Sequence, residues 1–68
     1  MKYKIIDKSS YAINQARILK NGNVEVLTTY LYGKPCKMIY TKENFIKWRN
    51  DINNTSEQEN KNIIDYIL

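Results

Sequence analysis

The first forty residues alternate apolar and polar side chains in short stretches, which is the pattern of β-strands. Lys2 to Ile6 places Tyr3 and Ile5 on one side and two lysines on the other, which predicts a strand with one solvated face. Val24 to Tyr32 alternates for longer and is apolar on both faces, which predicts a central strand. Cys36 to Tyr40 predicts one more strand, reached through a turn that contains glycine and proline.

The segment from Tyr11 to Lys20 fits two structures. Its two alanines, with Gln15 and Leu19, favour a helix that a preceding serine would cap. Against this, Asn21-Gly22 lies between two apolar stretches, which is a strong β-hairpin signal because a type I′ turn needs positive φ at both central residues. We favour the hairpin, and the helix remains the alternative.

Two helices are predicted after the strands. Thr41 is a good N-cap for a helix over residues 42–53, in which Phe45, Trp48 and Ile52 form a stripe that would lie on the sheet, and Asn53-Asn54 would end it. Two overlapping capping boxes, Thr55 with Gln58 and Ser56 with Glu59, then predict a second helix over residues 57–67.

The expected fold is therefore α+β. It comprises a small antiparallel sheet of three to four strands over about residues 2–40, followed by two C-terminal helices. We expect one helix to cross a face of the sheet and the other to pack at its end. Residues 1–68 are predicted to form a single domain, near the lower size limit for a chain without disulfides or metal.

Charge is distributed unevenly along the chain. Residues 1–49 hold ten Lys and Arg against three acids, whereas residues 50–68 hold one lysine against four acids. A basic body would attract polyanions or an acidic protein surface. However, Lys outnumbers Arg nine to two, and Ile, Lys, Asn and Tyr make up half of the chain, as codon usage in an AT-rich genome would produce. Whether the positive charge is functional or reflects codon bias is left open.

The composition argues against several classes of function. The chain has no His and a single Cys, which leaves no ligand set for zinc and no partner for a disulfide. It has two glycines and no phosphate-binding loop, and no acids are spaced as a catalytic pair. No stretch is long and apolar enough to span a membrane. We therefore expect a cytoplasmic, non-enzymatic protein with no cofactor and no membrane partner.

Nucleic-acid binding is one functional interpretation. Five of the six tyrosines fall in the sheet region among lysines and Arg17, and a sheet that exposes aromatic rings among cations can stack bases and neutralise phosphates. The alternative is that these tyrosines are half-buried strand residues with solvated hydroxyls.

Residues 11–53 also resemble a known family. The order of a strand, the Asn21-Gly22 turn, a strand, and then Tyr40-Thr41-Lys42-Glu43 leading into a helix with Trp48 is similar to the arm-type DNA-binding domain of phage integrases. The resemblance implies a three-stranded sheet in the major groove with one helix behind it. By position, Arg17, Lys20 and Lys37 would face the groove or phosphates, and Phe45 and Trp48 would be core.

Protein binding is the interpretation that we favour. In size and composition the chain resembles the small proteins that phages and mobile elements encode against host defences, such as anti-CRISPR proteins. This implies an inhibitor or modulator of a host protein or nucleoprotein complex. Sequence-tolerant binding of double-stranded DNA or RNA is the alternative.

Under either hypothesis the expected contact residues lie near the two turns and the central strand: Arg17, Lys20, Tyr30, Tyr32, Lys34 and Lys37. A homodimer is a third interpretation, in which the apolar C-terminal residues would dock across a two-fold axis: Ile63, Ile64, Ile67 and Leu68. The other reading of these four residues is that they cover the sheet.

Overall fold

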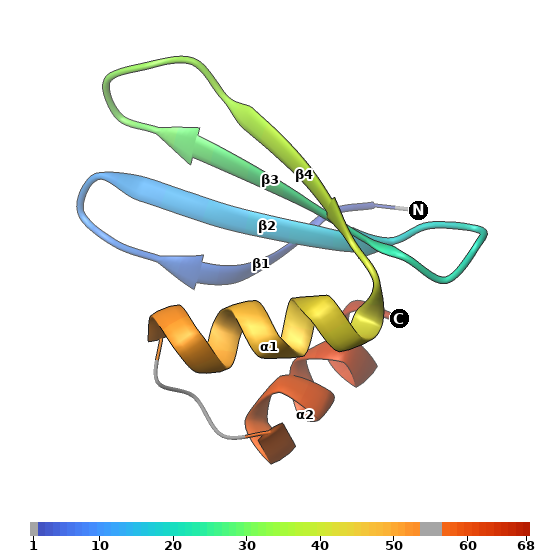
Figure 1. The fold of residues 1–68 in the computed structure, drawn as a ribbon. Coiled ribbons are helices and arrows are strands. Elements are labelled where there is room, and N and C mark those ends of the chain that lie inside the picture. The colour runs from blue at the N-terminus through green and yellow to red at the C-terminus, as the bar shows by residue number, and fades with distance from the viewer. Residues whose placement is uncertain (1, 54–56) are drawn as a thin grey trace.

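A computed structural model describes residues 2–53 and 57–68 of the chain (Figure 1). Four strands form one antiparallel sheet in the order β1-β2-β3-β4, with bounds β1 Lys4–Lys8, β2 Ala12–Ile18, β3 Val24–Tyr30 and β4 Cys36–Tyr40. Helices α1 (Lys42–Asn53) and α2 (Glu57–Ile67) follow and occupy the predicted ranges. The predicted α+β fold, a sheet of up to four strands followed by two C-terminal helices, is confirmed.

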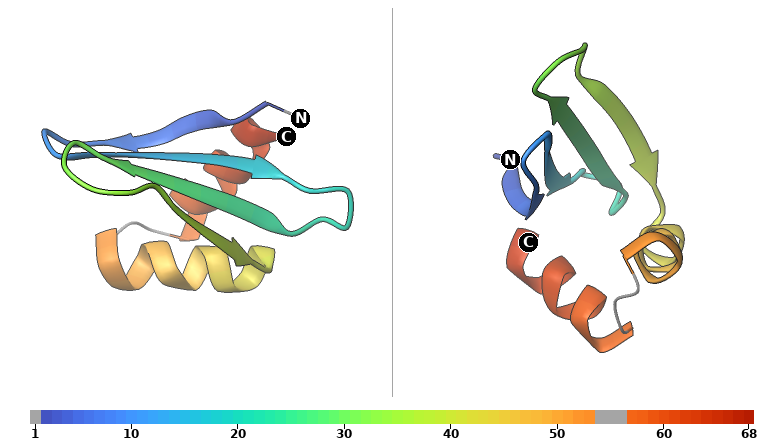
Figure 2. Two further views of the ribbon diagram at one scale, coloured as in Figure 1. Left: turned by 90° about the horizontal axis from the view of Figure 1, so that it is seen from above. Right: turned by 90° about the vertical axis from the view of Figure 1, so that its left-hand side faces the viewer.

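The two helices lie on the same face of the sheet (Figure 2). The expectation that the second helix would pack at the end of the sheet is therefore wrong, since α2 also lies below it and places Ile64 and Ile67 in the core. Within residues 2–53 and 57–68, the opposite face carries no helix, and we call it the open face.

The ambiguous segment forms strand β2, so the hairpin is confirmed and the helix is not formed. Its turn differs from the expected two-residue type I′ turn. The amide of Gly22 donates to the carbonyl of Leu19 at 2.9 Å, and the amide of Leu19 donates to the carbonyl of Asn23 at 2.8 Å. The loop therefore contains three residues, and Gly22 follows the turn with a φ of 88°, which glycine adopts without strain.

Two predicted strands have different bounds in the structure. Strand β3 ends at Tyr30 and not at Tyr32, because the chain turns away before Gly33, whose φ of 141° favours glycine. Strand β1 begins two residues later than expected and contains a register shift between Ile5 and Asp7. As a result Ile6 packs against the core, whereas Ile5 is exposed.

The core lies between the sheet and the two helices. The alternation along β2 and β3 places Ala16 opposite Val26 and Ile18 opposite Val24, with all four side chains directed to the helices. Phe45 of α1 is completely buried against them. Tyr40 stacks on Trp48, with ring centroids 5.3 Å apart, and so closes the core beneath β4.

Polar contacts fix the two helices. The amide of Asn44 donates to the hydroxyl of Thr41 at 3.1 Å, so the predicted N-cap of α1 is present. Between the helices, Nε of the buried Arg49 donates to Oδ1 of Asn60 at 3.0 Å, and Nδ2 of Asn60 donates to the carbonyl of Ile46 at 3.2 Å. Burial lowers the pKa of the Arg49 guanidinium.

Some predicted features fall outside the described residues. These are the capping boxes that begin at Thr55 and Ser56, the helix end at Asn53-Asn54 and the side chain of Ile52.

We expect Phe45→Ala to lower the free energy of unfolding by about 3–5 kcal/mol, because it deletes the largest completely buried side chain and leaves a cavity. Urea denaturation measures this loss. Tyr32→Ala is the control, since that ring is 90% exposed and its removal should change stability by less than about 0.5 kcal/mol. Equal losses in the two variants would contradict this account of the core.

Candidate functional site

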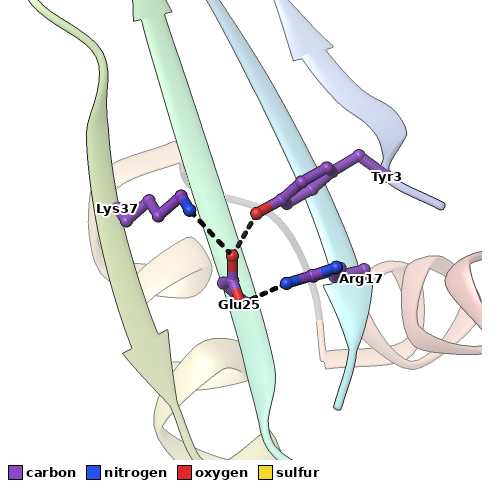
Figure 3. Close-up of polar contacts among 4 residues, drawn as sticks. All are labelled: Tyr3, Arg17, Glu25 and Lys37. Atoms are coloured by element: carbon purple, nitrogen blue, oxygen red, sulfur yellow. Dashed lines mark hydrogen bonds and ion pairs between the residues drawn. The ribbon is translucent and has the colours of Figure 1, made fainter. Parts of the chain in front are cut away.

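Glu25 is buried on the open face, where three neighbouring side chains surround its carboxylate (Figure 3). Nη2 of Arg17, from β2, donates to Oε2 at 3.0 Å, and the hydroxyl of Tyr3 donates to Oε1. Nζ of Lys37, from β4, lies 3.9 Å from Oε1. The register explains this cluster, because Arg17 is directly opposite Glu25 and Lys37 is opposite Leu27, which is two residues further along β3 and on the same face as Glu25.

The contacts shift the pKa values of the groups involved. Hydrogen bonds, first from Tyr3 and then from Arg17, lower the pKa of Glu25 below its ordinary value. The same bond to Glu25 raises the pKa of Tyr3. The guanidinium of Arg17 also lies 4.7 Å from the centre of the Tyr3 ring, which is a cation–π contact. The Glu25 carboxylate is therefore ionised at neutral pH and holds Arg17 in place across the sheet.

A second group of side chains lies at the opposite end of the strands from the β2–β3 turn. The loop between β1 and β2 and the loop between β3 and β4 lie there side by side (Figure 1), and the amide of Leu31 donates to the carbonyl of Tyr11 at 2.8 Å. Tyr32 is 90% exposed, Tyr11 66%, Leu31 64% and Tyr30 42%. We call these four residues, with Lys8 and Lys34, the loop-end surface.

The loop-end surface is hollowed. A depression of about 350 Å³ is lined by Lys8, Tyr11, Tyr30 and Leu31, with Ile13 and Thr29 among the strand residues that line it. A second depression, of about 250 Å³, lies between the same two tyrosines and Trp48 of α1. Tyr11 and Tyr30 therefore separate two depressions, one of which continues onto the open face and the other toward the helices.

The chain segments that line the larger depression carry only positive charge, whereas Asp7 lines the smaller one. Residues 8–12 and 28–37 contain Lys8, Lys34 and Lys37 and no acid. An occupant of the larger depression would therefore combine an apolar or aromatic group with negative charge nearby.

The predicted contact residues divide into three places. Arg17 and Lys37 meet at Glu25, whereas Tyr30, Tyr32 and Lys34 belong to the loop-end surface. Lys20 lies in the β2–β3 turn, at the other end of the sheet. The structure therefore does not bring the six residues together on one surface.

Sequence reasoning missed Tyr11 and Leu31 as members of the site. The predicted strand order could have identified them. In a meander of four antiparallel strands the first and third turns lie at the same end of the sheet, and Tyr11 is in the first turn and Leu31 in the third.

The C-terminal residues proposed for a dimer contact lie largely in the fold itself. Ile64 and Ile67 belong to the core and Ile63 packs against it, whereas Leu68 is exposed. These isoleucines cover the sheet, so α2 cannot offer them to a second copy.

Comparison with protein-family models, with curated proteins and with solved structures finds no match to this chain. Among residues 2–53 and 57–68, no three Cys, Asp or Glu side chains gather as a metal site. None of the helices in that part of the chain is long and apolar enough to cross a membrane.

We expect Tyr3→Phe to raise the pKa of Glu25 toward its ordinary value, because the variant loses the hydroxyl donor but keeps the ring beside Arg17. An NMR titration of the Glu25 side-chain carboxyl carbon measures the shift. An unchanged pKa in the variant would contradict the contact.

The cluster also predicts how stability depends on pH. Because the folded-state pKa of Glu25 is lower than the unfolded value near 4.5, its stabilisation is complete above that pH and is lost as the pH falls through the folded pKa. Glu25→Gln should therefore lose most stability relative to wild type at neutral pH, and this loss should shrink as the pH falls below about 4.5 and through the folded-state pKa of Glu25. Thermal unfolding across this range measures the difference, and a deficit that is independent of pH would refute the assignment.

Proposed function

We propose that this chain is a non-enzymatic binding protein that inhibits or modulates a host protein complex, and that it holds its partner through the loop-end surface. The observation that carries this proposal is a depression of about 350 Å³ at one end of the sheet, which Tyr11, Tyr30 and Leu31 line and which the exposed Tyr32 follows directly in the chain.

The loop-end side chains suit a protein partner. Tyrosine is enriched at the energetically important positions of protein interfaces, where its ring is buried and its hydroxyl keeps a polar partner. Leu31 and Tyr11, which line the depression together, give the apolar centre of such an interface, and Lys8 and Lys34 supply a basic rim. We infer that the partner presents an apolar or aromatic side chain beside acidic residues.

The open face favours a protein partner over insertion of the sheet into the major groove of DNA. Arg17 is the arginine with which the sheet would read bases or grip phosphates, and it is engaged by Glu25 and Tyr3. The buried carboxylate also places a negative charge in the middle of the face that the integrase-like interpretation would insert into DNA. The open face is therefore poorly suited to a phosphate backbone.

The biological setting that we propose rests on size and composition. A small basic chain with AT-rich codon preferences is typical of phages and mobile elements, and the proposed target is a cytoplasmic host complex, including a CRISPR or other defence nucleoprotein. The excess of lysines would orient the protein toward an acidic patch on that target.

Direct binding of double-stranded DNA or RNA is the second candidate. The observation in its favour is that three exposed tyrosines stand among Lys8, Lys34 and Lys37 in segments without acids. A mobility-shift titration against generic DNA at low and high salt separates the candidates. We expect no shift at low salt, whereas a tight complex that weakens steeply with salt would favour nucleic acid.

The proposed surface is tested with a partner identified by affinity purification and then measured by calorimetry. We expect Leu31→Ala and Tyr32→Ala each to weaken binding at least about tenfold, about 1.4 kcal/mol, because each removes an apolar anchor of the interface.

Tyr66→Ala is the matched control. This tyrosine is 55% exposed but belongs to α2, where Lys4 lies over its ring, so its removal should leave the affinity within about twofold of wild type. Circular dichroism checks the fold of each variant. If Tyr66→Ala weakens binding and the loop-end variants do not, the proposed surface is wrong.

A further inference from the structure

The smaller depression of the loop-end surface differs from the larger one in its chemistry. It measures about 250 Å³ and is lined by three aromatic residues, Tyr11, Tyr30 and Trp48, together with the acid Asp7. The larger depression shares the two tyrosines but has Lys8 as its charged residue among those described. The two depressions therefore carry opposite charge on the two sides of one pair of tyrosines.

The register shift in β1 places Asp7 beside the smaller depression. Ile5 pairs with Gln15, but Asp7 pairs with Asn14, so one residue between them has no counterpart. Directly opposed residues of antiparallel strands share a face, and Asn14 lies on the same side of β2 as the buried Ala16. Without the extra residue Asp7 would share the open face with Ile5, so the bulge directs its carboxylate to the helix side. Bulges often redirect a side chain in this way next to a functional site.

Asp7 has no direct polar partner for its side chain. The residue is exposed, and the carboxylate makes no hydrogen bond or ion pair within residues 2–53 and 57–68. Its charge acts on Arg49 without contact, since burial lowers the pKa of Arg49 and the Asp7 charge opposes that effect. An occupant that covered Asp7 without a donor would strip water from the carboxylate at a cost in free energy. This argues against an apolar occupant, and repulsion argues against an anion.

The aromatic side of the depression is held in position by the fold. The Trp48 ring stacks on Tyr40, with centroids 5.3 Å apart and ring planes 15° apart. In the loop, the hydroxyl of Ser9 accepts from the amide of Tyr11 at 3.4 Å, and the carbonyl of Tyr11 accepts from the amide of Leu31 at 2.8 Å. An occupant would therefore meet a largely preorganised site.

We propose that the smaller depression binds a guanidinium group and, resting on the proposed function, that this group is an arginine side chain of the partner protein. A guanidinium is planar, stacks on aromatic rings and pairs with a carboxylate through two parallel hydrogen bonds. The depression offers aromatic rings and the Asp7 carboxylate together. A lysine ammonium is more strongly hydrated and cannot make the planar paired contact, so arginine fits better.

The first test titrates the isotope-labelled protein with N-acetyl-arginine amide at constant ionic strength and follows its NMR spectrum. We expect saturable shifts at the amides of Asp7 and Tyr11 and at the indole of Trp48, because these residues line the depression. N-acetyl-citrulline amide has the same shape without the charge and should bind at least about fivefold more weakly. N-acetyl-lysine amide should also bind more weakly than the arginine compound.

Asp7→Asn should weaken binding of the arginine compound at least about fivefold, because it removes the charge and keeps the size of the side chain. Asp65→Asn is the matched control. It removes the same charge from an exposed residue of α2 that lines neither depression, so the affinity should stay within about twofold of wild type. The proposal is overturned by an absence of shifts at Asp7 and Tyr11 up to about 0.1 M of the arginine compound, by equal binding of the citrulline or lysine compound, or by equal effects of the two variants.

The second test measures Asp7→Asn against the purified partner, where we expect a loss of affinity of at least about fivefold. If Leu31→Ala and Tyr32→Ala weaken the complex and Asp7→Asn does not, the proposed function stands and the arginine contact is wrong. If the arginine compound binds but all three variants keep the partner affinity of wild type, the guanidinium site stands and the loop-end surface does not hold the partner.

Discussion

The structure depends on the burial of one face of a small sheet. Ala16, Ile18, Val24 and Val26 form the floor of the core, and Phe45 with the isoleucines of α2 closes it from below. Both helices are needed for this, because a chain of 68 residues has few large apolar side chains to spare. Because the helices cover one face of the sheet, the surfaces left for binding are the open face, the two edge strands and the loop-end surface.

The distribution of charge on those surfaces is decided by Glu25. Its buried carboxylate draws Arg17, Tyr3 and Lys37 together across the sheet, so part of the positive charge is used within the fold. Burial of a carboxylate without polar partners costs free energy because the charge loses its water. The contacts with Arg17, Tyr3 and Lys37 offset that cost. The exposed lysines are spread over the molecule, but three of the exposed tyrosines, Tyr11, Tyr30 and Tyr32, lie at the loop end, which is why we place the partner there.

Much of the fold could be predicted from the sequence because local signals agreed with one another. Thr41 caps α1 as expected, and the Asn21-Gly22 signal correctly identified a hairpin, although three residues form its loop. The candidate site was harder to predict. Which tyrosines are exposed depends on where β3 ends and on the register shift in β1, and neither is encoded by alternation alone. The partnership of Arg17 with Glu25 could have been inferred only once the pairing of β2 with β3 was known.

The central claim is that a partner protein contacts the loop end of the sheet. Chemical-shift mapping of the labelled protein with its unlabelled partner tests this most directly, since it reports each backbone amide without any substitution. We predict that the largest perturbations fall in residues 8–12 and 28–34, around Tyr11 and Tyr32. Perturbations centred instead on Arg17, Glu25 and Lys37 would place the partner on the open face and contradict the account.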